Sequence, residues 1–194
     1  LFTLLVGASV RLRRPHDLSV DEPGALIQMD SKYVQLPNGK TVFQFGAIDC
    51  FTRKRVVDLA PSLTSEEGAR FLHKVFSGFP FPVQAIQSDG GAEFLGDFTK
   101  TVAELRLTHY FNRPYYHQGN GRIERSFRTD NDEFYHVQDL PADFGGLKNA
   151  LLTWNHRYES WRLHQALGYL TPDQFYQQWL SRQPQRKEAV SDMS

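Results

Sequence analysis

Three carboxylates in distinctive local contexts are the residues best suited to carry chemistry. Asp30 ends an apolar run that begins at Ala25, and Asp89 ends a second run and is followed by two glycines. Glu124 opens a helical pattern just after Asn120-Gly121. Two aspartates on strands and one glutamate on a helix can hold divalent metal ions against a phosphodiester. The pattern therefore predicts an enzyme that cuts or joins nucleic acid.

The chemistry of these groups also favours particular metals. Two unpaired carboxylates that lie close together repel each other unless one takes up a proton or a cation binds. Sites built from a few protein oxygens and water suit Mg²⁺ or Mn²⁺. Two such ions can activate an attacking oxygen and stabilise a leaving one. Glu124 could complete the second metal site, and Arg128, one helical turn later, could meet a backbone phosphate.

Each carboxylate taken alone also has an ordinary structural interpretation. Glu124 and Arg128 form an i,i+4 pair of the kind that contributes only about 0.3–0.5 kcal/mol on a helix surface. Asp89-Gly90-Gly91 is common turn chemistry, and Asp30 could be an edge or bulge residue. The three together, in the element order described next, favour the catalytic interpretation.

The elements that would position these residues begin with a meander of three strands. The sequence predicts strands over 25–35, 41–50 and 55–60, with a hairpin turn at Asn38-Gly39. A capping box at Thr64 and Glu67 opens the next helix, which Gly78 and Pro80 end. The remaining predicted elements are a strand at 83–87, a helix carrying Phe94, Phe98, Val102 and Leu105, a strand at 107–111, a mobile loop at 113–121, a helix over 122–136 and a last helix with an apolar stripe from Leu147 to Trp161.

This order predicts an α/β fold. Three antiparallel strands followed by strands that alternate with helices indicate a mixed five-stranded sheet flanked by helices, which is the order of the ribonuclease H-like fold. In such a sheet the first strand is central and the fourth lies beside it, so Asp30 and Asp89 would be neighbours. We expect Trp154 and Trp161, on the last helix, to serve packing rather than ligand binding.

Composition sets the remaining limits. The chain has 194 residues, a formal net charge of zero and one cysteine, Cys50, so an intramolecular disulfide and a zinc finger are excluded. We expect a buried thiol near a strand end, which fits a reducing, cytosolic setting. Residues 1–9 form an apolar run too short to cross a membrane. Five arginines and one acid lie between Arg106 and Arg128, but charge alone does not separate a nucleic-acid surface from a solvated helix face.

We divide the chain into three parts. Residues 1–23 include a short basic arm from Arg11 to Arg14 and are predicted to be a linker or N-terminal extension from the missing part of a longer protein, with an ordered extension as the alternative. Residues 24–178 are the predicted catalytic core. Residues 179–194 are predicted to be a polar C-terminal tail that frays.

At the three carboxylates the chain resembles the catalytic cores of DDE transposases and retroviral-type integrases, and most of all those of bacterial insertion-sequence transposases. The matching stretches are Gln28 to Asp30, Gln87 to Phe94, Arg113 to Tyr115, Gln118 to Arg125 and Arg162 to Pro172. The resemblance covers residues from about 24 to 178. Asp89 and Glu124 are separated by 34 residues, which agrees with the usual spacing in such cores.

The resemblance implies a polynucleotidyl transferase that cleaves DNA at an element end and then joins the freed 3′-hydroxyl to target DNA. Asp30 and Asp89 would share one Mg²⁺ or Mn²⁺ and Glu124 would hold the second, with no covalent enzyme intermediate. Its partners would be element ends, target DNA and further copies of itself, with no membrane, and it would work in the bacterial cytoplasm at the nucleoid. The residues expected to contact DNA are Arg113, His117, Gln118, Asn120, Arg122, Arg125, Arg128 and Asn131.

Two features depart from the family pattern. Many relatives carry Lys or Arg seven residues after the glutamate, where this chain has Asn131, and Arg128 could substitute for it. The helix-turn-helix DNA reader usual in such transposases is not seen, so we expect this chain alone to lack sequence-specific end recognition. The alternatives are a plain metal-dependent nuclease and a non-catalytic DNA-binding or assembly module left from a decayed element. A carboxylate-pair glycosidase is a more distant alternative, since it would not explain the basic patch.

Overall fold

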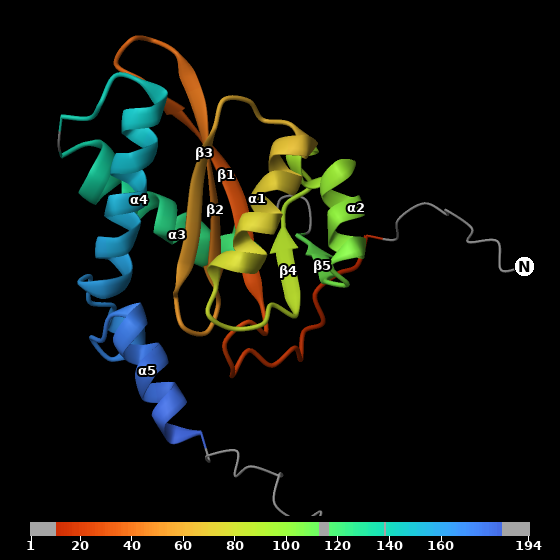
Figure 1. The fold of residues 1–194 in the computed structure, drawn as a ribbon. Helices are drawn as coiled ribbons and strands as arrows, with labels where there is room; N and C mark the ends of the chain where they lie inside the picture. The colour runs from red at the N-terminus through yellow and green to blue at the C-terminus, as the bar shows by residue number, and fades with distance from the viewer. Residues whose placement is uncertain (1–10, 113–116, 138, 184–194) are drawn as a thin grey trace, which may run out of the picture.

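The computed structural model of the protein describes residues 11–112, 117–137 and 139–183. Its centre is a five-stranded sheet in the order β3-β2-β1-β4-β5 (Figure 1). The strands are β1 (Ile27–Gln35), β2 (Thr41–Asp49), β3 (Arg55–Ala60), β4 (Ala85–Ser88) and β5 (Thr108–Phe111). The first three strands are antiparallel, whereas β4 pairs parallel to β1 and β5 pairs parallel to β4. The predicted mixed sheet, with β1 central and β4 beside it, is confirmed.

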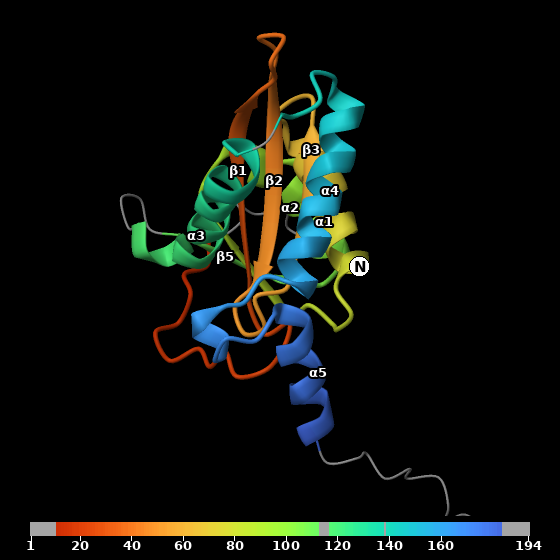
Figure 2. The same ribbon diagram turned by 90° about the vertical axis from the view of Figure 1, so that its left-hand side faces the viewer.

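Helices cover both faces of this sheet. They are α1 (Ser65–Gly78), α2 (Asp97–Glu104), α3 (Gly121–Asp130), α4 (Phe144–Ser160) and α5 (Pro172–Arg182). Figures 1 and 2 show α1 and α2 on one face and α3 and α4 on the other. None of the helices within the described ranges is long and apolar enough to cross a membrane.

The pleat of the strands divides the core into two layers. On β2, Phe45 and Ala47 pack with Phe71 and Leu72 of α1, whereas Val42 belongs to the cluster on the α4 side. Successive side chains of a strand point to opposite faces of the sheet. Because helices cover both faces, nearly every residue of a central strand segment is buried. All six residues of β3 are buried, as a strand between two helical layers should be.

The region around Cys50 joins residues 11–23 to the sheet. The Leu12 carbonyl accepts a hydrogen bond from the amide of Phe111 (2.9 Å), and Leu18 packs against the buried cluster that contains Leu26 and Cys50. Cys50 directly follows β2 and is buried, as predicted, and burial raises the pKa of its thiol to about 11. Residues 11–23 are therefore an ordered extension along the sheet, while the predictions for residues 1–10 and 184–194 lie outside the described residues.

Several predicted elements differ in detail. The helix expected over 122–136 is α-helical only to Asp130 and continues as a π-helical turn, η3 (Asn131–Tyr135). Phe94 lies in a separate 3₁₀ turn, η1 (Ala92–Phe94), because Gly96, at a φ of 52°, interrupts the helical conformation before α2 begins. Trp161 follows the end of α4 and is 77% exposed, so the prediction that it packs in the core was wrong.

Helix α5 is absent from the predicted elements, although its start is well marked. Thr171 and Gln174 form a capping box, and Pro172 occupies the first turn. Tyr176 is buried, and its hydroxyl donates to the carbonyl of Pro80 (3.0 Å). Lys54, in the β2–β3 turn, forms ion pairs with Glu159 of α4 and Asp173 of α5. The helix runs through the boundary predicted between residues 178 and 179.

Candidate active site

Strand pairing brings the two aspartates to the same end of the sheet. β1 and β4 are parallel neighbours with Ile27 opposite Ile86 and Gln28 opposite Gln87. Asp30 and Asp89 each follow two residues after the last of these pairs, and so lie near the carboxyl end of the β1–β4 pair. Oδ1 of Asp30 accepts from the amide of Ser31 (2.8 Å), and Oδ1 of Asp89 accepts from the amide of Gly91 (2.9 Å).

The side chain of Gln28 fixes the start of the helix that carries Glu124. Its Oε1 accepts from the backbone amides of Arg122 (3.0 Å) and Ile123 (3.3 Å), and its Nε2 donates to the carbonyl of Gly119 (2.7 Å). The first amides of a helix have no partner within the helix, so a buried glutamine on β1 satisfies two of them. Gln28 and Asp30 lie on the same face of β1. The strand that carries one carboxylate therefore also positions the helix that carries another.

A glycine on β2 lets α3 approach the sheet closely. Gly46 pairs with Asp30 across the β1–β2 ladder. A Cβ added to Gly46 would come within 2.7 Å of Phe127 and 3.0 Å of Ile123, which is closer than real Cβ contacts allow. Ile123, Phe127 and Ile48 form a small buried cluster under the helix. The helix therefore lies directly over the strand position beside Asp30.

Two of the three predicted catalytic carboxylates, Asp89 and Glu124, act electrostatically on the third, Asp30. The pKa of Asp30 is raised to about 7, first because the carboxyl is buried and then because the negative charges of Asp89, Glu124 and Glu93 disfavour its ionised form. Glu124 itself is exposed in the first turn of α3. Among the described residues, no three acidic, histidine or cysteine side chains lie close enough together, as they stand, to hold a metal ion.

A fourth carboxylate, Glu93, belongs to this region and was given no role from the sequence. It is buried in η1, and its Oε1 accepts from the hydroxyl of Ser31 (2.5 Å). A Cβ added to Gly91 would lie 2.5 Å from Oε2 of Glu93 and 3.0 Å from Oδ1 of Asp89, so the two carboxylates flank the same glycine. The sequence shows Glu93 four residues after Asp89, but nothing in that spacing reveals that it lies beside β1.

The donor set fits a hard divalent cation. Asp30, Asp89 and Glu124 offer only carboxylate oxygens, which are the ligands that Mg²⁺ and Mn²⁺ prefer. The pKa of Asp30 is raised mainly by burial and further by the charges of Asp89, Glu124 and Glu93, and a cation bound between these groups would favour the ionised form. The chemistry of the donor set therefore agrees with the predicted metals, although these side chains are not gathered into a coordination shell.

The predicted DNA contacts fall into three groups. Arg113 lies outside the described residues; His117 and Gln118 belong to the 3₁₀ turn η2 (His117–Asn120), where the structure does not describe their side chains. Arg125 and Arg128 are exposed on α3, and Arg122 is half-buried. Asn120 is only 4% exposed, and its Nδ2 donates to the carbonyl of Met29 (3.2 Å). This amide ties η2 to β1, and the predicted contact of Asn120 with DNA stays a prediction.

Asn131 is also engaged within the protein. Its Oδ1 accepts from Nζ of Lys32 (2.6 Å), which also lies 4.4 Å from the centre of the Tyr135 ring. Burial lowers the pKa of Lys32 to about 8. Lys32 lies two residues after Asp30 on the same face of β1. Lys32 thus brings a positive charge from β1 to the level of Asn131, and the predicted contact of Asn131 with DNA stays a prediction.

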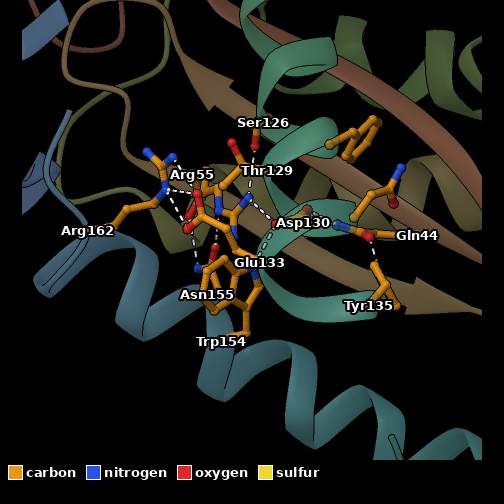
Figure 3. A network of polar contacts seen from close by, with 12 residues as sticks. Gln44, Arg55, Ser126, Thr129, Asp130, Glu133, Tyr135, Trp154, Asn155 and Arg162 are labelled. Atoms are coloured by element: carbon orange, nitrogen blue, oxygen red, sulfur yellow. Dashed lines mark hydrogen bonds and ion pairs between the residues drawn. The ribbon is translucent and has the colours of Figure 1, made fainter. Parts of the chain in front are cut away.

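A buried polar network, shown in Figure 3, anchors the far end of α3. Nη1 of Arg55 donates to Asp130 (2.7 Å) and to Ser126 (2.8 Å), and neither the Arg55 nor the Asp130 side chain is exposed. Trp154 of α4 and Gln44 of β2 also donate to the Asp130 carboxylate, each at 2.7 Å. Because these partners lie on β2, β3 and α4, the network fixes α3 against three elements. Sequence spacing could not reveal it, since Arg55 and Asp130 lie 75 residues apart.

This sheet order is that of a ribonuclease H-like core, with Asp30 on β1, Asp89 directly after β4 and Glu124 on α3. Two family models described as the integrase core domain match the chain, one over residues 20–117 and the other over residues 105–172. The chain belongs to the integrase core domain family. Among curated proteins, none matches it.

Solved structures share the fold at low sequence identity. The HTLV-2 integrase catalytic core domain in complex with magnesium has a TM-score of 0.63 and 18% identity, over 79% of this chain and 97% of that one. The catalytic core domain of BIV integrase has a TM-score of 0.60 and 19% identity, over 80% and 95%. A chain of the simian T-cell lymphotropic virus intasome, in complex with PP2A regulatory subunit B56 gamma, has a TM-score of 0.69 and 18% identity. That match covers 95% of this chain but only 61% of the intasome chain.

Proposed function

We propose that the chain is the catalytic core of a DDE transposase or integrase, which cleaves DNA at an element end and transfers the freed strand to target DNA. The observation that carries this proposal is the placement of three carboxylates around the β1–β4 pair of an integrase-type sheet. Asp30 lies on β1, Asp89 directly follows β4, and Glu124 lies on α3, whose start Gln28 of β1 holds. A closer likeness to bacterial insertion-sequence transposases remains a prediction.

In this proposal Asp30 and Asp89 hold one Mg²⁺ or Mn²⁺ and Glu124 holds the second. When bound, such ions supply Lewis-acid stabilisation of the charges that develop at the transferred phosphoryl group. The protein contributes positioning: Gln28 and Gly46 set where α3 starts and how closely it lies to Asp30. Catalysis of this kind rests on orientation and charge neutralisation, so no serine or tyrosine nucleophile is required.

DNA is the proposed partner, and Arg125 and Arg128 are the side chains best placed to meet its phosphates. Both are exposed on the helix turns next to Glu124, and both line a hollow of about 500 Å³ that Glu124 also lines. Joining two DNA ends calls for more than one copy of the core, and the HTLV-2 core is described in dimeric and trimeric forms. Work on DNA would place the protein with the bacterial nucleoid in the cytoplasm.

The test is a cleavage and strand-transfer assay with an end-labelled duplex, a target plasmid and Mn²⁺. We expect cleaved ends and joined products from the wild-type protein and neither from Asp89→Asn, while Asp17→Asn, an exposed control in the N-terminal extension, retains wild-type rates. Cleavage without joining would favour a plain nuclease. DNA binding that is equal with and without metal, and no cleavage by any variant, would favour a non-catalytic module and refute the proposal.

A further inference from the structure

A strongly cationic hollow lies beside the first turns of α3. It has a volume of about 440 Å³, and its walls carry four arginines and one histidine: Arg53, Arg122, Arg125, Arg162 and His164. Among the described residues that line it there is no carboxylate. We call this hollow the arginine pocket. A hollow with four guanidinium groups and no acid in its walls has the character of an anion-binding site.

Three separate segments supply these side chains. Arg122 and Arg125 come from the start of α3, and Arg162 and His164 follow the end of α4. Arg53 comes from the β2–β3 turn, where its backbone has a φ of 64°. This left-handed conformation is unfavourable for a residue with a side chain, and such strain gathers at functional sites. The fold thus brings arginines from distant parts of the sequence to one place.

Few negative charges balance these arginines. Arg162 pairs with Glu133 (2.7 Å), whereas Arg53, Arg122 and Arg125 form no ion pair within the described part of the chain. Burial and then the charge of Arg122 lower the pKa of Arg53. Like charges held together in a partly buried place repel, and a bound anion would turn this repulsion into attraction.

His164 also lines the arginine pocket, and its ring is affected by the nearby positive charges. Its Nε2 is buried and has no hydrogen-bond partner among the described residues. Burial, and after it the charges of Arg162, Arg55 and Arg53, lower the pKa of His164 to about 4. A buried ring nitrogen without a partner is unfavourable, and in the tautomer that carries its proton on Nε2 this nitrogen can donate to an anion in the pocket.

The arginine pocket adjoins the hollow that Glu124 lines. The hollow that contains Glu124 and Arg128 shares Gly121, Arg125, Thr129 and Arg162 with it. Both hollows are open at the surface of α3, so an extended ligand that passes Glu124 can reach Arg53 along the same side of the helix. An isolated phosphate pocket would not need this continuity, whereas a polymer with regularly spaced phosphates would use it.

We propose that the arginine pocket binds a backbone phosphate of DNA and holds the strand that runs past Glu124, with Arg53 as a principal contact. This inference rests on the proposed function, because that function supplies the DNA that reaches the neighbouring hollow. Guanidinium groups match phosphate oxygens through paired hydrogen bonds. Contacts of this kind set the position of the duplex without reading its sequence.

The test is the salt dependence of duplex binding, measured by fluorescence anisotropy without divalent metal. Arg53→Gln should make the slope of log K against log[NaCl] shallower by about 0.9, as expected for one lost phosphate contact, and should weaken binding several-fold. Arg106→Gln is the matched control: it removes an arginine that also has a left-handed backbone, at a φ of 55°, and that does not line either hollow. It should leave the slope unchanged.

Arg122→Gln is a second test of the arginine pocket, which decides the matter if Arg53→Gln does not fold. The side chain of Arg122 makes no hydrogen bond or ion pair with other described residues, and its backbone amide, which donates to Gln28, is unaffected by the substitution. Truncating the side chain should therefore preserve the fold and make the slope shallower by about 0.9 as well. Slopes equal to wild type in both Arg53→Gln and Arg122→Gln would overturn the proposal, as would a wild-type protein that binds no DNA. Binding of inorganic tripolyphosphate that depends on Arg53, with an unchanged DNA slope, would overturn it in favour of a free polyphosphate.

The two proposals fail in different ways. If the wild-type protein cleaves and joins DNA but Arg53→Gln and Arg122→Gln both keep the wild-type slope, the arginine pocket is refuted and the catalytic core stands. If no protein cleaves DNA but the slope depends on Arg53 and Arg122, the catalytic core is refuted and the pocket stands.

Discussion

Replacing Asp30 by asparagine should stabilise the metal-free protein at neutral and alkaline pH. The folded protein raises the pKa of this carboxyl from 3.8 to about 7, mainly through burial and then through its acidic neighbours. Above pH 7 the folded state must carry a carboxylate that its surroundings disfavour. Asparagine removes this charge but keeps an oxygen that can accept the hydrogen bond from the amide of Ser31.

The size and sign of the effect follow from proton linkage. A group that holds its proton more firmly in the folded than in the unfolded state lowers the free energy of unfolding as pH rises from the unfolded pKa to the folded one. For Asp30 that window is from 3.8 to about 7. Asparagine should therefore stabilise by ~2 kcal/mol at pH 5 and by ~4 kcal/mol at pH 8. In a chain of this size ~4 kcal/mol corresponds to a rise in Tm of roughly 8–16 °C.

The assay is thermal unfolding of wild type, Asp30→Asn and Asp17→Asn at pH 5 and pH 8, each with and without millimolar Mn²⁺. Exposed Asp17 should give little change at either pH. Mn²⁺ should raise the Tm of wild type at pH 8, because a ligand that binds only the folded state stabilises it, and should not raise that of Asp30→Asn. A variant no more stable than wild type at pH 8, or equally stabilised at both pH values, would refute the reasoning about Asp30.

Three further predictions concern the groups around Asp30. Gly46→Ala should destabilise the protein by about 1–3 kcal/mol through overpacking and should reduce DNA cleavage by displacing α3. Urea unfolding and the cleavage assay measure the two effects, and no change in either would contradict the close approach of α3 to Gly46. Asp130→Asn should destabilise by about 3–5 kcal/mol, because it leaves the Arg55 charge buried without its partner; a loss below about 1 kcal/mol in urea unfolding would show that Arg55 finds other acceptors. Glu93→Gln should weaken Mn²⁺ binding several-fold in calorimetry, since it removes a negative charge beside Asp89, and equal affinities would remove Glu93 from the site.

The sequence predicted the sheet well because the relevant signals are local. Apolar alternation marked β1 to β3, the capping box at Thr64 marked the start of α1, and the Asn38-Gly39 turn marked the hairpin. The region after α4 was harder. There the apolar stripe suggested that Trp161 packs like Trp154, but the helix ends at Ser160 and the chain turns away. Helix α5 has its own capping box, a signal that was present and was not used.

The candidate site was predictable only in part, for a different reason. Acidic residues at strand ends can be recognised from local context, whereas the role of an amide depends on what lies across the fold. Asn120 and Asn131 could serve either DNA or the protein, and the structure shows both engaged with β1 through Met29 and Lys32. Arg55 is charged and follows a turn, so its sequence position suggested nothing of its complete burial.

One face of β1 explains much of the geometry. Gln28, Asp30 and Lys32 alternate on that face: Gln28 holds the start of α3, and Lys32 reaches the carbonyl of Phe127 (3.4 Å) and the side chain of Asn131 beyond the end of the helix. Asp30 lies between these two anchors. Helix α3 is thus fixed at both ends by the strand that carries the central carboxylate, and the Asp130 network adds β2, β3 and α4. The side chain of Glu124 is exposed, so of the three carboxylates it has the most freedom to adjust. When the three carboxylates bind a metal, we therefore expect the rotamer of Glu124 to change while α3 stays in place.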